Sequence, residues 1–260
     1  MRLVRVPKCG ACGIRLSPTE KTDPRIYHRL CFCESCLEKW MRARSEICPA
    51  CSKTAEECSC STDALPLTCF FFYHPQEQNI QSRVILSMKS KCSNELFEYM
   101  SAELVRHLSA RLEVAGIAGE DCIYTWVPRK RYAVVNTGFD QGRELCRRVA
   151  SCFGKKESFL FVRRGGKRQK KLNKGERMKN IERAVFLKNK YLPLAPQRNP
   201  KKAISLKGKT VVVVDDVVTT GATLRHAVKL LRGAGADQVI VACLAKTKGK
   251  APKKSGVTVG

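Results

Sequence analysis

Two adjacent carboxylates near the C-terminus have the surroundings of a sugar-phosphate site. Asp215 and Asp216 follow a run of valines and precede Thr219–Thr223, a segment of three threonines, one glycine and one alanine. The valines predict a strand that is buried on both faces, which places the two carboxylates at its end. The threonine-rich segment predicts a tight turn into a helix. Its free amide groups, its hydroxyls and the positive end of the helix dipole together favour an anion.

These groups predict a site for a phosphorylated sugar. The turn would take the phosphate, and the two acids would take the ribose hydroxyls, directly or through Mg²⁺. The alternative is an ordinary buried strand and helix with a surface pair of aspartates. The predicted site comprises Asp215 and Asp216, which are also the catalytic candidates, with Val217, Thr219, Thr220, Gly221, Ala222 and Thr223.

The cysteines indicate a second kind of chemistry. The chain has 15 of them, and most lie before residue 70. A Cys-x-x-Cys sequence holds one side of a tetrahedral zinc ion, because a tight turn brings its two sulfur atoms together. Structural metal is favoured over a disulfide framework, since the segment has too little apolar content to bury a core alone. The predicted ligands are Cys9, Cys12, Cys33 and Cys36 for one site, and Cys48, Cys51, Cys58 and Cys60 for another.

The second zinc site leaves alternatives open. Its Cys58-x-Cys60 pair is a less usual clamp than Cys-x-x-Cys, so Cys69 or Cys31 could replace a ligand. His28 could also compete for a place, and reduced thiols without metal are the alternative at both sites. We expect one or two structural zinc ions.

The charge of the chain favours polyanionic partners. Lys and Arg number 49 against 23 Asp and Glu, which gives a formal net charge of +26. A dense basic block predicts a loop that clamps pyrophosphate or follows a single-stranded nucleic acid, with a solvated insertion as the alternative. The candidates in this block are Arg163, Arg164, Lys167, Arg168 and Arg177, joined by three cations that follow a predicted strand, Arg129, Lys130 and Arg131.

Hydrophobic periodicity predicts an α/β domain. Strands are expected at 67–73, 122–127, 158–162, 209–215 and 238–244, and helices at 80–91, 95–115, 139–153 and 222–233. Strands that alternate with helices imply a parallel sheet with ligands at the carboxyl ends of its strands, where the acidic pair falls. Phe159, Phe161 and Phe186 are assigned to the core. The residues before 8 are too few and too charged for a signal peptide, and no apolar run has membrane-spanning length, so we expect a cytoplasmic protein without membrane insertion.

The segment Val211–Leu224 resembles the phosphoribosyl pyrophosphate (PRPP) binding motif of the type I phosphoribosyltransferases: an apolar strand, an acidic pair, and then Thr-Thr-Gly-Ala-Thr. With the Cys-rich head, the chain resembles the ComF family, which is associated with natural DNA transformation. The pieces similar to that family are Phe70–Tyr73, Val84–Lys89, Trp126–Arg129, Gly138–Gln141 and Gln169–Asn180.

The resemblance implies an α/β fold with a type I phosphoribosyltransferase-like parallel sheet flanked by helices, and a small N-terminal Cys-rich zinc-ribbon domain. It divides the chain into a zinc-binding domain at 1–65, a phosphoribosyltransferase-like domain at 66–247 and a disordered basic tail at 248–260. It implies binding of PRPP with Mg²⁺ and of single-stranded DNA. A competence helicase or other DNA-uptake proteins are the implied partners.

The chain departs from the family in one loop. Thr137 stands where the family carries Arg, and Asp140 stands where it carries Asn. An Arg there would pair with pyrophosphate, so that role passes to Arg129, Lys130 and Arg131. Two alternatives to a DNA-handling protein stay open. One is an active phosphoribosyltransferase that transfers ribose 5-phosphate to a nitrogenous acceptor, and the other is a PRPP-sensing regulator.

Overall fold

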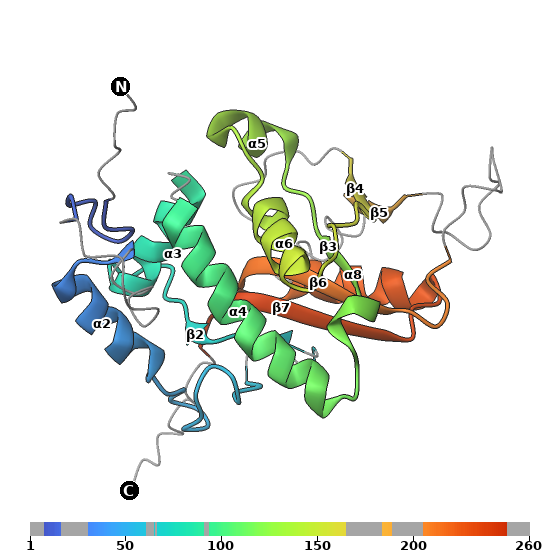
Figure 1. Cartoon of the computed structure of the whole chain (residues 1–260), viewed down its shortest axis with the longest axis horizontal. Helices are drawn as coiled ribbons and strands as arrows, with labels where there is room; N and C mark the ends of the chain where they lie inside the picture. Colours follow the sequence, from blue (N-terminus) through green and yellow to red (C-terminus); the bar gives the residue numbers. More distant parts are fainter. Residues whose placement is uncertain are drawn as a thin grey trace, which may run out of the picture.

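A computed structural model of the chain describes residues 8–16, 31–60, 65, 67–90, 94–164, 184–188 and 205–248. Within them, Figure 1 shows helices packed around one central sheet. The helices are α2 (Glu34–Arg44), α3 (Ile80–Ser90), α4 (Asn94–Val114), the 3₁₀ turn η2 (Gly119–Asp121), α5 (Arg131–Thr137), α6 (Gln141–Cys152) and α8 (Ala222–Gly233). The strands are β1 (Leu67–Thr68), β2 (Phe71–Phe72), β3 (Ile123–Trp126), β4 (Phe161–Arg163), β5 (Val185–Leu187), β6 (Thr210–Val218) and β7 (Gln238–Lys246).

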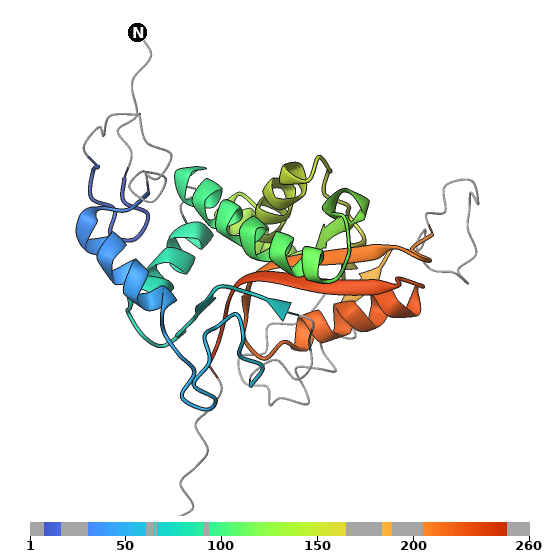
Figure 2. The same ribbon diagram turned by 60° about the horizontal axis from the view of Figure 1, so that its bottom comes forward.

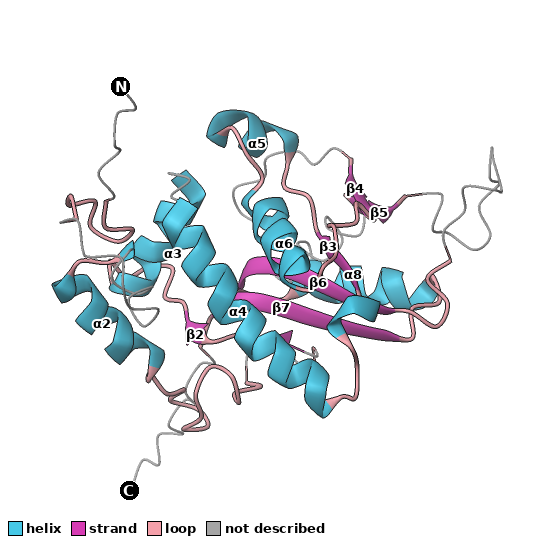
Figure 3. Ribbon diagram, in the orientation of Figure 1, coloured by secondary structure: helices cyan, strands magenta, loops and turns pink. Residues whose placement is uncertain are grey.

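The central sheet is parallel, as predicted. Its order is β1-β7-β6-β3, and β2 continues the line of β1 along β7. Strands β6 and β7 lie in its middle and are buried along almost their whole length, which is why their sequences are nearly continuous runs of apolar residues. Figure 3 shows these two long strands between the helical layers.

Helices cover both faces of the sheet. One face packs through Val212 and Val214 against a core that includes residues of α2, α3, α4 and α6. The other face packs through Val211 and Val213 against α8 and the small β4–β5 sheet. In Figure 2, α4 and α6 lie on one side of β7 and α8 lies on the other. The alternation of side chains along a strand divides the valines between these two cores.

The Cys-rich N-terminal segment packs on the same cores. Trp40 of α2 is fully buried, its ring centroid lies 4.9 Å from that of Phe71 in β2, and its indole Nε1 donates to Tyr99 Oη of α4 at 2.9 Å. Cys9 and Cys36 belong to the core of one face, and Cys48 and Cys58 to the core of the other. The predicted domain boundary at residue 65 stays a prediction, because packing on a shared core does not show whether the two segments fold as one unit or as two.

Most predicted elements are confirmed with small shifts in their ends. The four predicted helices are present as α3, α4, α6 and α8. The predicted strand at 67–73 is interrupted and forms the short strands β1 and β2. Helix α5 was not predicted, because it buries none of its residues and therefore has no apolar periodicity. It ends at Gly138, whose φ of 77° is readily adopted only by glycine.

Two sequence predictions are wrong in detail. Strand β6 runs to Val218, so Asp215 and Asp216 lie inside the strand and not beyond its end. The cause is that β7 continues to pair with it, as far as Lys246 opposite Val218. The segment predicted as a strand at 158–162 leaves the edge of β3 after Ser158, whose N–H donates to Tyr124 O at 2.7 Å, and its last part pairs antiparallel with β5.

The assignment of the three phenylalanines to the core is correct only for Phe161, which is fully buried. Phe159 is 44% exposed and Phe186 is 38% exposed. The reason is that the β4–β5 pair is covered on one face only, so the middle residue of β5 points to solvent while its neighbours are buried.

The apolar stripe of α4 gives a test of the helix-covered face. Leu104 is fully buried against this core, whereas Val114 on the same helix is 89% exposed. We expect Leu104→Ala to lower the free energy of unfolding by about 2–5 kcal/mol, because it removes apolar contacts and leaves a cavity. The matched control Val114→Ala should stay within about 0.5 kcal/mol of the unmodified protein. Urea unfolding followed by circular dichroism measures both, and equal effects would contradict this packing.

Candidate functional site

Asp216 lies at the centre of a polar cluster at the carboxyl end of β6. Its side chain is on the face of the sheet covered by α3 and α6, and the residue is only 9% exposed. Its Oδ2 atom lies 3.2 Å from Nζ of Lys89 at the end of α3 and accepts a hydrogen bond of 2.9 Å from Nε2 of Gln141 in α6. Its Oδ1 accepts the Val217 amide at 2.7 Å. Three elements distant in sequence therefore converge on this carboxylate.

Asp215 points to the opposite face of the sheet, because successive side chains of a strand alternate. It is half-buried, and its Oδ1 accepts the amide N–H of Asp216 at 2.8 Å. Arg163 of β4 is close enough for the two charges to interact. Its Nε is buried without a hydrogen-bond partner among the described residues, and its guanidinium donates to Pro128 O at 3.3 Å. Asp215 thus has a cation on its own side of the sheet.

The two acids differ in how readily they ionise. Burial, followed by the negative charge of Asp216, raises the pKa of Asp215 to about 8. Burial alone would also raise the pKa of Asp216, but the charge of Lys89 and the hydrogen bond from Gln141 outweigh burial and lower it. At neutral pH the pair therefore carries one proton, which lies on Asp215.

The turn between β6 and α8 has amide groups without a backbone acceptor among the described residues, two of them in exposed residues and the third in the buried Gly221. Thr219 and Thr220 are exposed, and Gly221, with a φ of 67°, turns the chain into α8. Within the described part of the chain, the amide groups of Thr219, Thr220 and Gly221 donate no backbone hydrogen bond. Arg225, one turn into α8, folds back and donates to Thr220 O. Free amide groups at the N-terminus of a twelve-residue helix are the elements of an anion site.

Arg129 links this site to the loop after β3. Its guanidinium donates to Gln141 Oε1, and Gln141 in turn donates to Asp216. The backbone N–H of Arg129 donates to Asp140 Oδ2 at 3.2 Å. Asp140 also caps α6, since its Oδ1 accepts the amides of Gly142 and Arg143. An Asn at this position could keep the two cap bonds at its Oδ1 but could not accept from Arg129, because its Nδ2 only donates, whereas the carboxylate of Asp140 accepts on both oxygens.

Of the other predicted cations, three lie among the described residues. Lys130 and Arg131 are at the start of α5, where Arg131 is exposed. Arg164 is exposed, and its guanidinium lies 6.0 Å from the ring centre of Phe186. Lys167, Arg168 and Arg177 fall outside the described residues.

Sequence reasoning gave no site role to Lys89 or Gln141, although both make direct contacts with Asp216. A signal was present in the sequence, because the two residues end Val84–Lys89 and Gly138–Gln141, segments that resemble pieces of the ComF family. Their role depends on α3 and α6 packing side by side on β6, and spacing along the chain does not report that packing.

Both predicted cysteine clusters are brought together. The Sγ atoms of Cys9, Cys12, Cys33 and Cys36 lie within 4.8 Å of one another, and so do those of Cys48, Cys51, Cys58 and Cys60. A tetrahedral ZnS₄ centre has sulfur–sulfur edges of about 3.8 Å, and the sulfur atoms of Cys12 and Cys33 are 3.8 Å apart. Two four-cysteine sites therefore fit structural zinc.

The two clusters share a turn geometry. In the first, Gly13 N donates to Cys9 O at 2.8 Å, and in the second, Ser52 N donates to Cys48 O at 2.8 Å. Both residues that follow the Cys-x-x-Cys pair have positive φ, 78° for Gly13 and 56° for Ser52. This turn points two sulfur atoms to one side. Cys69, the alternative ligand, instead donates its thiol to Ala55 O at 3.2 Å.

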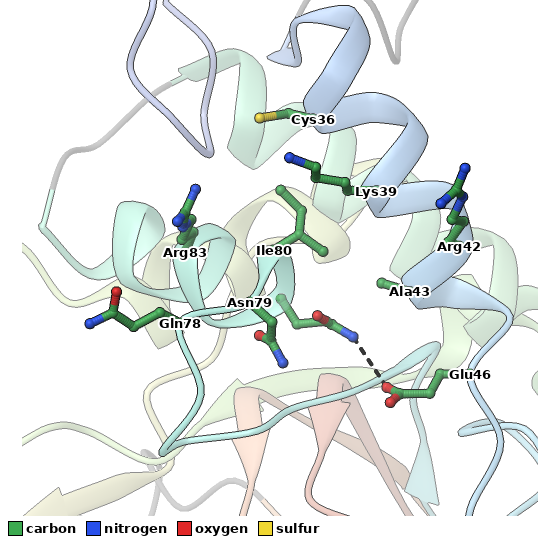
Figure 4. A pocket seen from close by; sticks show the side chains of 10 residues that line it. Cys36, Lys39, Arg42, Ala43, Glu46, Gln78, Asn79, Ile80 and Arg83 are labelled. Carbon is green, nitrogen blue, oxygen red and sulfur yellow. Dashed lines mark hydrogen bonds between the residues drawn. The ribbon is translucent and has the colours of Figure 1, made fainter.

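A surface cavity of about 450 Å³ lies away from the acids, between α2 and α3. Figure 4 shows Lys39 and Arg83 on its two sides with Ile80 between them, and a hydrogen bond at its base from Gln81 to Glu46. Glu46 also accepts from Lys248 at 2.6 Å and contacts His74 at 2.9 Å. Its described lining includes neither the acidic pair nor the turn.

The strand and the turn that carry this site lie in a part of the chain that is similar to known proteins. The family model described as "Phosphoribosyl transferase domain" matches residues 142–259, which include β6, the turn and α8. The chain contains a phosphoribosyl transferase domain. With the parallel sheet flanked by helices, this establishes the phosphoribosyltransferase-like fold. No helix in the described ranges has both the length and the apolar character to cross a membrane.

Curated relatives share short segments with this chain. A ribose-phosphate pyrophosphokinase of Pyrococcus furiosus is 40% identical over 62 residues, which cover 24% of this chain and 22% of that protein. The transcriptional regulator GfcR of Methanosphaera stadtmanae is 44% identical over 45 residues, 17% of this chain and 23% of that protein. This chain thus spans less than a quarter of the length of the relatives it matches here.

Solved structures are similar at lower identity. The allosteric regulatory enzyme of purine biosynthesis aligns with a TM-score of 0.32 and 21% identity over 64% of this chain and 27% of that chain. A purine phosphoribosyltransferase from Pyrococcus horikoshii aligns with a TM-score of 0.31 and 20% identity over 60% of this chain and 80% of that chain.

The raised pKa of Asp215 predicts a pH dependence of stability. A carboxyl whose folded pKa is raised stabilises the fold fully below about pH 4, and this contribution is lost as the pH rises to about 8. Asp215→Asn cannot ionise, so we expect its Tm to exceed that of the unmodified protein at pH 9, with a smaller difference at pH 5. Differential scanning calorimetry at both pH values measures this.

The exposed Asp237 is the control, and Asp237→Asn should follow the unmodified protein at both pH values. A Tm difference for Asp215→Asn that is equal at pH 5 and pH 9 would contradict the assignment of the proton to Asp215.

Proposed function

We propose that this protein binds PRPP with Mg²⁺ at the carboxyl end of β6. The single observation that carries the proposal is the free amide groups of Thr219–Gly221 at the N-terminus of α8, directly after an acidic pair. A 5-phosphate needs several N–H donors and a positive dipole end, and the ribose hydroxyls need carboxylate acceptors at the other side. These two requirements are met within one stretch of chain.

In this proposal each group has a separate task. The amides and hydroxyls of Thr219, Thr220, Gly221, Ala222 and Thr223 hold the 5-phosphate. Asp215 and Asp216 accept from the ribose hydroxyls, and the neighbouring Val217 completes the strand below them. Mg²⁺, when bound, neutralises the pyrophosphate and orients it. Arg129 and Arg163 are the cations best placed to meet the pyrophosphate, since one is linked to Asp216 through Gln141 and the other lies beside Asp215.

Binding without assured turnover is the function the site supports best. Transfer to a nitrogenous acceptor would need, in addition to this site, a base pocket next to the ribose. The similarity to ComF proteins adds a cytoplasmic role in natural transformation to the proposal. A PRPP-sensing regulator is the alternative, and the short similarity to GfcR is the observation in its favour.

Calorimetric titration with PRPP and Mg²⁺ tests the proposed site. We expect measurable binding by the unmodified protein and roughly 10–100-fold weaker binding by Asp216→Asn, because charge-assisted hydrogen bonds contribute about 1.5–3 kcal/mol each. Asp237→Asn, which removes an exposed carboxylate far along the chain, should bind normally. Equal affinity of all three proteins for PRPP would refute the assignment. Release of pyrophosphate with a free base would favour the transferase instead.

Single-stranded DNA is the second proposed ligand, and specific surface residues favour it. Phe186 is exposed beneath Arg164, and the exposed Phe159 lies 3.6 Å from the Nζ atom of Lys188 and stacks on Trp126. Tyr132 of α5 is also exposed and interacts with Arg163. Aromatic rings next to cations suit a single strand, because bases stack on the rings and phosphates meet the cations.

Fluorescence anisotropy with a labelled oligonucleotide tests this second ligand. We expect affinity to fall steeply as salt is raised, because bound cations release counterions, and we expect little dependence on sequence. Phe186→Leu should weaken binding by about 1–3 kcal/mol, the usual contribution of one stacked base. Val114→Ala, which changes an exposed apolar residue at the end of α4, is the control. No detectable affinity at low salt would remove single-stranded DNA from the proposal.

A further inference from the structure

A buried lysine lies between the second cysteine cluster and the proposed phosphate turn. Lys246, the last residue of β7, is only 1% exposed. Its ammonium group donates to the carbonyl oxygen of Cys58, and the Phe72 ring centre lies 6.0 Å from Nζ. Among the described residues, no carboxylate lies within ion-pair distance of this ammonium group. A buried ammonium group with a carbonyl and a ring as its neighbours lacks a full countercharge.

The second cysteine cluster can supply that countercharge once it holds zinc. Four thiolates around one Zn²⁺ carry a formal net charge of −2, and the Sγ atoms of Cys48, Cys51, Cys58 and Cys60 are placed for such a centre. Cys58 is both one of these ligands and the direct partner of Lys246. Groups that contact the ligands of a metal site from outside usually tune its affinity.

The end of β7 also holds the proposed phosphate turn. Lys246 pairs with Val218 of β6 on one side and with Phe72 of β2 on the other. The next residue, Thr247, donates its amide N–H to Val218 O at 3.0 Å and its hydroxyl to Thr219 O at 3.1 Å. Thr219 is the first residue of the turn. A contact chain therefore runs from Cys58 through Lys246 and Thr247 to the anion site.

We propose that Lys246 is the countercharge of the second zinc centre and that zinc at this centre fixes the phosphate turn through the end of β7. Loss of this zinc leaves the ammonium group buried without an anionic neighbour, so the end of β7 and Thr219 lose their fixed position. The first zinc centre has no such connection among the described residues. The part that concerns phosphate binding rests on the proposed function, and the part that concerns zinc and turn order does not.

The experiment compares Lys246→Met with Lys248→Met as a matched control. Lys248 lies two residues further on and pairs with Glu46, not with a cluster carbonyl. Zinc content and its rate of transfer to a chromophoric chelator are measured for both variants. We expect two zinc ions in the unmodified protein and in the control. In Lys246→Met the second ion should be held roughly 10–100-fold more weakly, while the first is retained and reports an intact fold. Lys246→Arg should restore retention.

Hydrogen exchange of residues 218–223 then measures how well the turn is ordered. Calorimetry with PRPP and Mg²⁺ measures the affinity of the protein for the ligand. We expect faster exchange and weaker PRPP binding in Lys246→Met, both reversed by excess zinc. Unchanged zinc retention in Lys246→Met would overturn the countercharge role. Lost zinc with unchanged exchange would overturn the link to the turn. If the unmodified protein binds two zinc ions but no PRPP, the proposed function fails, and zinc retention and exchange still decide this inference.

Discussion

The parallel pairing of β6 with β7 is the constraint on which the rest of the structure depends. Register is kept from Thr210 opposite Gln238 to Val218 opposite Lys246. This pairing carries β6 past its apolar run and holds the acidic residues inside the sheet. It also brings the start of the turn and the end of β7 to one edge. Because strand side chains alternate, Asp216 meets α3 and α6, while Asp215 meets the β4–β5 side.

Burial and the neighbouring charged groups decide which of the two aspartates at this edge is ionised. Asp216 keeps its charge because Lys89 and Gln141 accompany it, and Asp215 gives up its charge because it is buried and because Asp216 beside it is negatively charged. A sugar phosphate adds negative charge to a site with two acids, so the nearby cations and Mg²⁺ are as necessary as the amide groups. The ion pair between Lys89 and Asp216 must open or be shared when a ribose hydroxyl or a metal approaches Asp216.

Sequence patterns predicted the parallel sheet, its four main helices and both cysteine clusters, because each depends on neighbours within one segment or on a fixed spacing. They could not predict that β6 continues to Val218, since that depends on how far β7 accompanies it. They also missed α5, which buries none of its residues, and the exposure of Phe186, which depends on what covers the two-stranded β4–β5 sheet. Lys89 and Gln141 reach Asp216 only through helix packing.

The most direct test of the central claim is the amide spectrum of the turn during titration with PRPP and Mg²⁺. In ¹H–¹⁵N correlation spectra, the account predicts that the amide signals of Thr219, Thr220 and Gly221 shift most, because these N–H groups gain phosphate acceptors. Asp216→Asn should reduce those shifts at equal ligand concentration. If the signals of the turn stay in place while those around Arg83 and Lys39 move, the ligand binds in the cavity between α2 and α3, and the account is contradicted.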